Sequence, residues 1–561
     1  MLTRRDFMQL TAAAAALGVT PQGIVRAAAR QQLTQADILQ FEPLGQVTLL
    51  HFTDLHAHLV PLYFREPSVN LGVGGVSGLP PHITGKAFLE RFGIDPGTPH
   101  AYALTSEDYA ALAASYGRVG GLDRLATLVD AVRAERPGRT LLLDGGDTWQ
   151  GSYTSLKTNG ADMVDVMNVL GVDAMTAHWE FTYGTNRVAE LAEQLNFAFL
   201  AGNVIDTEWE EPVYESTRFF ERGGVKVAVI GQAFPYTPVA NPRYLIPELS
   251  FGIRDAMVQS HVDAARAAGA QLVVLLSHNG FDVDRKLASR VSGIDVILTG
   301  HTHDALPVEV KVGNTVLIAS GSHGKFLSRL DVRVDGQRMV DYRYRLMPVF
   351  ADAIEPDAKM AAKIAEVRAP FSSEIERVVG RTESLLYRRG NMNGTFDDLI
   401  CNALLEERDA QIALSPGFRW GATLLPGQDI TIDDIYTQTA ITYPNAYRIE
   451  MTGAGLKAIL EDVADNLFNP DPYYQQGGDM VRVGGMGYRL EAHKSMGERI
   501  SSMTLLADGA PIESDKTYVV AGWASINEGT EGPPIFDVVA RYVERKQVVS
   551  VEPNQAIELI G

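Results

Sequence analysis

The stretch VTLLHFTDLH at residues 47–56 decides how this chain folds. Its apolar part, residues 47–52, predicts a strand buried on both faces, as in a layered α/β domain. Asp54 and His56 follow the strand directly. Side chains two residues apart at a strand end can point the same way, so this pair can chelate one metal ion.

The same alternation of a short apolar run and a polar loop continues to about residue 346. Amphipathic stretches at 122–132 and 255–268 lie between the runs and predict helices. Together they predict an α/β domain whose buried strands lead into loops rich in Gly, Asp, His and Asn. Further strands are expected at residues 140–143, 197–201, 225–230, 272–276, 294–298 and 316–319.

Seven candidate metal ligands lie in five separate segments, most of them just after a predicted strand. Each short motif alone is weak evidence, because turns and strand ends often carry Asp or His. Five such motifs in one order are hard to explain as core or surface histidines. Mixed imidazole and carboxylate ligands suit first-row divalent ions and suit calcium poorly. The candidates are Asp54, His56, Asp147, His178, His278, His301 and His303.

Length and composition bound the possible organisation and partners. The chain has 561 residues, a formal net charge of −20 and one cysteine, Cys401. This length predicts two domains. The acidic balance argues against nucleic acid and anionic membranes as partners. A single cysteine excludes a disulfide framework within the chain.

Three changes in composition and residue pattern along the chain suggest the domain limits. Residues 60–115, rich in Gly and Pro, are expected to form an irregular surface insertion. Residues 356–379 have the pattern of one exposed helix. After about residue 380 the sequence pattern changes to a helix at 395–407 followed by turn-rich strands. We therefore expect a catalytic domain at 30–350, a linker at 351–379 and a substrate-binding domain at 380–561.

The N-terminus has the features of an export signal. Arg4 and Arg5 precede an alanine-rich apolar run, which ends in the small residues 27–29. Residues 1–29 resemble a twin-arginine signal peptide, which implies export of a folded, metal-loaded protein to the periplasm. A chance Arg-Arg pair in a cytosolic helix is the alternative. We expect a monomer without stable membrane association.

The ordered ligand motifs resemble those of the metallophosphoesterase family, and more closely its two-domain periplasmic 5′-nucleotidase branch. The resemblance implies a sandwich of two mixed sheets flanked by helices, followed by a C-terminal α+β substrate domain. It also implies which residues share an ion. One ion would be held by Asp54, His56, Asp147 and His303, and the second by Asp147, His178, His278 and His301.

One motif departs from the nucleotidase pattern. Where that branch has Gly-Asn-His-Glu-Phe-Asp-Tyr-Gly, this chain has AHWEFTYG at 177–184. His178 replaces an amide ligand and can still bind metal. Trp179 replaces the catalytic histidine and Thr182 replaces its aspartate partner. The loss of this dyad, with every metal ligand retained, argues against an ordinary phosphomonoesterase.

This pattern resembles the Sox sulfur-oxidation thiosulfohydrolases. The resemblance implies a hydrolase that releases sulfate from a cysteine S-thiosulfonate on a sulfur-carrier protein of the SoxYZ type. It also implies two divalent metal ions, manganese (Mn2+) in that family, although the ligand types alone do not favour manganese over zinc or iron. A 5′-nucleotidase or sugar-nucleotide phosphohydrolase, and a metal-loaded module that binds the carrier without cutting it, remain alternatives.

The C-terminal domain is expected to supply substrate contacts. Arg419 lies where nucleotidases place an anion-binding arginine, so we assign it a catalytic role beside Asp147 and His178. Glycine-rich segments there suggest a narrow channel for an extended peptide arm. The expected substrate-binding residues are Trp179, Arg419, Tyr443, Asn445 and Asp479.

Overall fold

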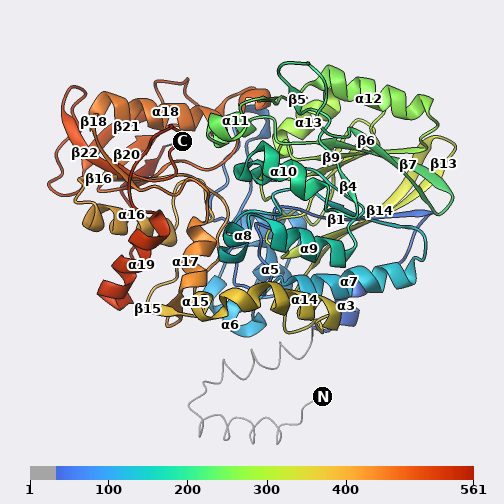
Figure 1. The fold of residues 1–561 in the computed structure, drawn as a ribbon, viewed down its shortest axis with the longest axis horizontal. Helices are drawn as coiled ribbons and strands as arrows, with labels where there is room; N and C mark the ends of the chain where they lie inside the picture. Colours follow the sequence, from blue (N-terminus) through green and yellow to red (C-terminus); the bar gives the residue numbers. More distant parts are fainter. Residues whose placement is uncertain (1–32, 561) are drawn as a thin grey trace, which may run out of the picture.

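The structure, a computed structural model, describes residues 33–560. The predicted export signal at 1–29 lies outside this range. Within it, no helix is both long and apolar enough to cross a membrane. The N-terminal and C-terminal halves lie side by side and meet along a shared boundary (Figure 1).

The N-terminal half contains two six-stranded mixed sheets. In the first, β1 is parallel to β2 and antiparallel to β13. The first sheet has the order β14 (Arg338–Pro348), β13 (Phe326–Asp335), β1 (Val47–Phe52), β2 (Thr140–Asp144), β3 (Ala174–Met175) and β4 (Ala198–Phe199). The second has the order β11 (Val310–Val312), β12 (Thr315–Ala319), β10 (Val296–Thr299), β9 (Leu272–Ser277), β7 (Val225–Gln232) and β6 (Thr217–Arg222). The predicted two-sheet architecture is confirmed.

The alternation of side chains along each strand explains why the sheets stack. Val47 and Leu49 of β1 point into a core between the sheets, where they join Val227 and Val274 of the other sheet. Leu50, on the opposite face, packs under the helices. Each such buried side chain contributes about 1.5–3 kcal/mol of transfer free energy. Helices α7 (Leu122–Glu135), α9 (Ala161–Leu170) and α14 (Ala358–Arg368) pack on one side, and α12 (Asp255–Ala267) and α13 (Phe281–Arg290) on the other (Figure 1).

The C-terminal half combines three small sheets with helices around two further apolar clusters. Its four-stranded sheet has the order β18 (Tyr447–Thr452), β22 (Thr517–Gly522), β16 (Ile412–Ser415) and β19 (Arg482–Gly484). One three-stranded sheet has the order β17 (Asp429–Thr431), β15 (Val378–Thr382) and β23 (Val548–Val549). The other has the order β21 (Ile500–Leu505), β20 (Met486–Leu490) and β24 (Ile557–Leu559). The main helices are α16 (Thr395–Glu407), α17 (Ile432–Thr439), α18 (Gly453–Phe468) and α19 (Ile535–Lys546). This is the expected α+β arrangement.

Two segments differ from the sequence-based expectation. The insertion at 60–115 is not irregular throughout, because it contains α4 (Gly85–Phe92), α5 (Pro99–Leu104) and α6 (Tyr109–Tyr116). Buried alanines and tyrosines of these short helices pack onto the main core.

The segment 356–379 is not one exposed helix. It divides into α14, a 3-10 turn at Ala369–Phe371 and α15 (Ser372–Ile375), and β15 begins at Val378. The break falls at Pro370, whose ring and missing N–H interrupt a helix. Met360 and Ile364 of α14 are buried, so the segment is part of the core and is exposed on one side only.

Candidate dimetal site

All seven predicted ligands lie in loops that follow the carboxyl ends of parallel strands. The pairs β1–β2, β2–β3 and β9–β10 are all parallel, so the loops after them meet at one edge of the sandwich. Asp54 and His56 follow β1, Asp147 follows β2, and His178 follows β3. His278 follows β9, and His301 and His303 follow β10.

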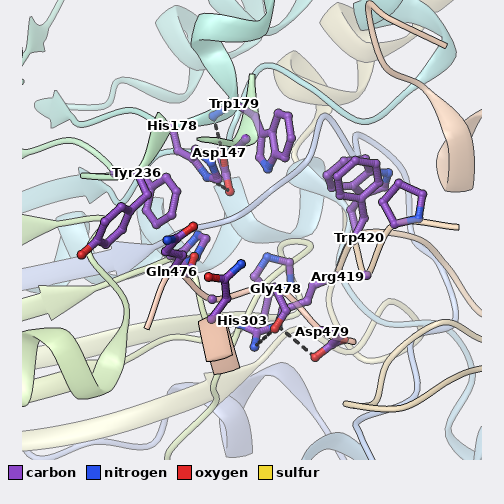
Figure 2. Close-up of a pocket in the computed structure, with 18 of the residues that line it drawn as sticks. Asp147, His178, Trp179, Tyr236, His303, Arg419, Trp420, Gln476, Gly478 and Asp479 are labelled. Atoms are coloured by element: carbon purple, nitrogen blue, oxygen red, sulfur yellow. Dashed lines mark hydrogen bonds and ion pairs between the residues drawn. The ribbon is translucent and has the colours of Figure 1, made fainter. Parts of the chain in front are cut away.

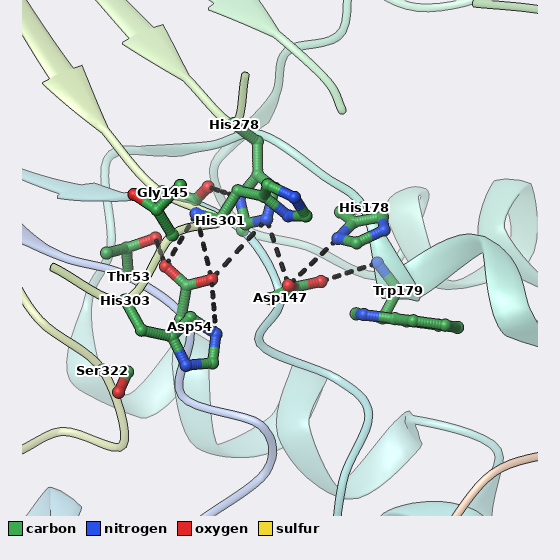
Figure 3. A network of polar contacts seen from close by, with 12 residues as sticks. Thr53, Asp54, Gly145, Asp147, His178, Trp179, His278, His301, His303 and Ser322 are labelled. Atoms are coloured by element: carbon green, nitrogen blue, oxygen red, sulfur yellow. Dashed lines mark hydrogen bonds and ion pairs between the residues drawn. The ribbon is translucent and has the colours of Figure 1, made fainter. Parts of the chain in front are cut away.

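Their side chains form two overlapping groups that can each hold one metal ion (Figure 3). In each group, one possible ligand atom per residue lies within 4.8 Å of the others. Asp147 belongs to both, and its Oδ2 lies 3.1 Å from Nδ1 of His178 and 3.0 Å from Nε2 of His278. The groups are Asp54, His56, Asp147 and His303, and Asp147, His178, His278 and His301.

The contacts of the imidazole rings fit metal binding. Nδ1 of His56 faces Oε1 of Gln150 at 3.3 Å, and Nδ1 of His278 faces the carbonyl of Gly145 at 2.6 Å. Such contacts fix a ring and leave its other nitrogen to face a cation. Accordingly, Nε2 of His56 and Nε2 of His303 lie only 3.1 Å apart. The donor set suits a pair of first-row divalent cations.

The backbone at the site is held in a rarely populated conformation. Five of the seven residues have a positive φ, between 48° for His56 and 74° for His301, and none of the five is glycine. Such residues cost about 1–3 kcal/mol each and persist where the surroundings enforce them. Here the loops brace one another, because Asp54 donates its N–H to Gly146 and His56 donates its N–H to Asp147, each at 2.8 Å.

Glu180 organises two of the ligand loops. Its buried carboxylate accepts hydrogen bonds from the backbone N–H groups of His178 and Thr148, each at 2.7 Å, and of Trp149 at 3.2 Å. Burial raises the pKa of Glu180, and the nearby charge of Asp147 adds to the shift. The sequence showed Glu180 only as part of a motif, and its role became visible through these long-range contacts.

The buried charges of the site are strongly coupled. Burial by itself would raise the pKa of Asp147, but the imidazoles of His178 and His278 outweigh it and hold the pKa well below its usual range. Burial likewise opposes the charged form of His278, yet the carboxylates of Asp147 and Asp54 raise its pKa to about 10. The two carboxylates therefore favour cationic partners strongly, as a metal site requires.

A cavity of about 180 Å³ opens above the metal ligands, with walls from both halves of the chain (Figure 2). Trp179 stands nearly perpendicular to Phe418 and Trp420, at ring-centre distances of 5.4 and 5.1 Å. Phe418 and Trp420 stack on each other at 4.0 Å. Phe234 also lines the cavity and stacks on His301 at 4.0 Å. Much of the cavity wall is therefore aromatic.

Of the predicted substrate contacts, Trp179, Arg419 and Asp479 line this cavity. Asp479 is nearly fully buried, and its Oδ1 accepts from Nε of Arg419 at 3.3 Å. Tyr443 and Asn445 do not line it. The hydroxyl of Tyr443 donates to the carbonyl of Ala240 at 2.6 Å, and the Asn445 amide donates to a backbone carbonyl at 2.6 Å, so both serve the packing between loops.

A second arginine near the site was missed in the sequence. Arg389 is buried and donates to the carbonyl of Thr302 at 3.0 Å. Burial lowers the pKa of His303 well below its usual value, and the charge of Arg389 lowers it further. Arg389 and Arg419 thus bring two guanidinium groups close to the metal ligands. The only sequence signal was the pair Arg388-Arg389 ahead of a helix, which solvated surface segments also show.

Two family models cover most of the chain. Residues 47–305 match the calcineurin-like phosphoesterases, and residues 378–541 match the 5′-nucleotidase C-terminal domain. The 5′-nucleotidase of Rattus norvegicus is 25% identical over 482 residues, which cover 77% of this chain and 82% of that protein. The solved 5′-nucleotidase precursor of Thermus thermophilus shares the fold, with a TM-score of 0.73, 21% identity, and coverage of 92% of this chain and 99% of that one.

A stronger match is the sulfate thiohydrolase SoxB of Thermus thermophilus, solved in complex with glycerol. It superposes with a TM-score of 0.89 at 37% identity, covering 93% of this chain and 98% of that chain. This likeness extends over both halves and includes the region of the two metal-ligand groups. The chain therefore belongs to the metallophosphoesterase and 5′-nucleotidase superfamily of metal-dependent hydrolases, in the family of the sulfate thiohydrolase SoxB.

Proposed function

We propose that this hydrolase releases sulfate from a cysteine S-thiosulfonate on a sulfur-carrier protein during thiosulfate oxidation. The observation that carries the proposal is the indole of Trp179, which stands in the cavity wall where nucleotidases have a catalytic histidine. Thr182 replaces the aspartate partner, and its hydroxyl pairs with the Thr442 hydroxyl at 2.7 Å. The dyad has thus been replaced by packing contacts, while both metal-ligand groups are complete.

The chemistry of the substrate explains why such a site can work without the dyad. A sulfonate carries one negative charge, whereas a phosphate monoester carries nearly two, so less charge must be stabilised. A persulfide is also a better leaving group than an alkoxide. When bound, a pair of divalent cations lowers the pKa of a water and polarises an oxygen of the substrate.

The reaction is a hydrolysis in which atoms balance. The oxygen of a water forms a bond to the sulfone sulfur, and the bond between this sulfur and its neighbour breaks. The electron pair of the broken bond stays on the carrier, which is left as a persulfide. Sulfate and two protons are the other products.

The chain's own residues hold the reacting groups. Asp147 lies between the two ligand groups, and the backbone N–H of Trp179 donates to its Oδ1 at 2.7 Å. Arg419 is anchored by Asp479 and by the carbonyl of Gly478, while its Nη1 has no hydrogen-bond partner within residues 33–560. This Nη1 is buried beside the cavity that Arg419 lines, and a sulfonate oxygen would give its unpaired N–H a partner.

The wider proposal covers the partner, the cation and the location. We propose a sulfur carrier of the SoxYZ type as partner, manganese as the cation, and a monomer exported to the periplasm by the twin-arginine route. Residues 30–350 would carry the metal ions, and residues 380–561 would supply the far wall of the cavity. That wall contains Gly478, where a Cβ would meet nothing closer than the carbonyl of Gly417 at 3.6 Å, and we propose that an extended peptide arm passes there.

Sulfate release from a carrier cysteine S-thiosulfonate, assayed beside phosphate release from a nucleoside monophosphate with manganese supplied, tests the proposal. Sulfate without phosphate is expected. Phosphate without sulfate would instead support a 5′-nucleotidase, the alternative favoured by relatives that match more than three quarters of the chain. Carrier binding without either product would indicate a binding module.

A further inference from the structure

We infer that the loop at Gln476 and Gly477, in the C-terminal half, is part of the metal centre of the N-terminal half. Through a carbonyl and a missing side chain, it fixes the tautomer and the position of His301. The second ligand group therefore gains a contact to one of its members that exists only where the two halves meet. This inference depends on the dimetal site and not on the identity of the substrate.

The first observation is a hydrogen bond across the boundary between the halves. Nε2 of His301 lies 3.2 Å from the carbonyl oxygen of Gln476. A carbonyl can only accept, so Nε2 must carry the proton, and the lone pair of this neutral ring is then on Nδ1. A contact of this kind to a ligating histidine sets the ring orientation and raises its basicity as a ligand.

The second observation is the close approach of Gly477 to the same ring. A Cβ added at Gly477 would lie 2.2 Å from Nε2 of His301 and 2.8 Å from its Cδ2. Phe234 stacks on the face of this ring at 4.0 Å, so the imidazole cannot easily move away. The position therefore requires glycine for the sake of His301, as well as for its φ of +75°.

The neighbouring glycine gives a matched comparison. Gly478 has nearly the same backbone conformation, with a φ of +77°, but a Cβ there would meet nothing closer than the carbonyl of Gly417 at 3.6 Å. Alanine at either position carries a similar conformational cost. Only alanine at Gly477 would also displace His301.

The two ligand groups differ in their dependence on the loop at Gly477. His301 belongs to the group with Asp147, His178 and His278. In the other group, the outer nitrogen of His56 contacts Gln150, a residue of the same half of the chain. Disturbing the loop at Gly477 should therefore weaken one metal site and leave the other close to its original affinity.

The experiment compares the full-length variants Gly477→Ala and Gly478→Ala by measuring bound manganese after dialysis against the lowest free manganese concentration that fills both sites of the original protein. Two ions per chain are expected for the original protein and for Gly478→Ala. One ion is expected for Gly477→Ala, with affinity for the second reduced by about 10–100-fold. Two ions bound by Gly477→Ala with unchanged affinity would overturn the inference, and sulfate release plays no part in this readout.

A second measurement covers the case in which Gly477→Ala does not fold. Histidine ¹⁵N NMR of the unsubstituted protein without metal reports which ring nitrogen of each imidazole carries the proton, and His301→Asn assigns the resonance. A proton on Nε2 is expected. A proton on Nδ1 would contradict the hydrogen bond to Gln476 and the inference with it.

Discussion

The backbone N–H of Trp179 donates a 2.7 Å hydrogen bond to Oδ1 of Asp147, while Oδ2 of the same carboxylate faces His178 and His278. Trp179 thus has two separable functions. Its main chain orients the carboxylate shared by both ligand groups, and its indole forms part of the cavity wall. A different side chain at this position would change the reaction environment and leave the orientation of Asp147 intact.

We expect Trp179→His combined with Thr182→Asp to restore the nucleotidase dyad. Phosphate release from a nucleoside monophosphate should rise by about 10²-fold, the lower end of what a positioned acid or base contributes. Sulfate release should fall, because the aromatic contact with Phe418 and Trp420 is lost. Parallel phosphate and sulfate assays measure both changes.

Trp179→Phe is the matched control, because it keeps an aromatic wall and the same main-chain hydrogen bond without adding a proton donor. It should show little phosphate release and retain most of the sulfate release. Equal phosphate release by both variants would mean that the size of the side chain, and not the missing dyad, excludes phosphate esters.

The apolar runs predicted several strands, and the sequence named the Asp and His residues that the structure brings together in two groups, because both depend on local pattern. β1 begins and ends where the apolar run 47–52 does, and four of the five ligand motifs follow a run that was predicted as a strand. The exception is His178, which follows the two-residue strand β3. The sequence did not predict how loops distant along the chain meet. Tyr443 and Asn445 have suitable side chains but turn towards other loops, and Glu180 gained its role from backbone groups of the loop at 147–149.

Arg419 and Asp479 allow anion binding to be tested apart from metal binding. Arg419→Ala should raise KM for the carrier substrate by about 10–100-fold, the range for losing a charged hydrogen bond. Asp479→Asn should raise KM less, by about 10-fold, because the arginine keeps its charge but loses an anchor. Steady-state kinetics at saturating manganese separate KM from kcat.

Asp465→Asn is a suitable control for that pair. Asp465 accepts from Arg499 at 2.7 Å in the C-terminal half but does not line the cavity. It should lower stability without changing KM. A KM for Asp479→Asn equal to that of Asp465→Asn would mean that Asp479 serves only the packing.

The insertion at residues 60–115 should bind more tightly to α13 at low pH. His82 pairs with Asp282 of α13 at 2.6 Å. Burial lowers the pKa of His82, and the charge of Arg419 lowers it slightly more. The hydrogen bond to Asp282 and the negative charges of Asp282 and Asp304 outweigh these effects, so the pKa lies above its usual 6.5. A raised histidine pKa stabilises the fold fully below pH 6.5, and this contribution is lost as pH rises through the folded-state pKa.

Proteolysis of the insertion by a protease active over the whole range measures this effect. Cleavage within residues 60–115 should be slow at about pH 6 and faster at about pH 9, where the imidazole is neutral. His82→Gln should remove the difference between the two conditions, because glutamine does not titrate. A pH dependence as large in His82→Gln as in the original protein would assign the effect to another group.

Asp147→Asn should disrupt both metal sites at once, because Asp147 is the only residue shared by the two groups. Without the metal ions the transition state loses several kcal/mol of stabilisation, which corresponds to a fall in the rate of sulfate release of about 10³-fold or more. Asp144→Asn is the matched control three residues away, since burial raises the pKa of Asp144 to about 8 and its carboxyl binds Thr148 outside both groups. An amide there replaces a carboxyl that is mostly uncharged at neutral pH. Metal analysis and the sulfate assay should show loss in Asp147→Asn and near-normal values in Asp144→Asn, whereas full sulfate release by Asp147→Asn would rule out the dimetal mechanism.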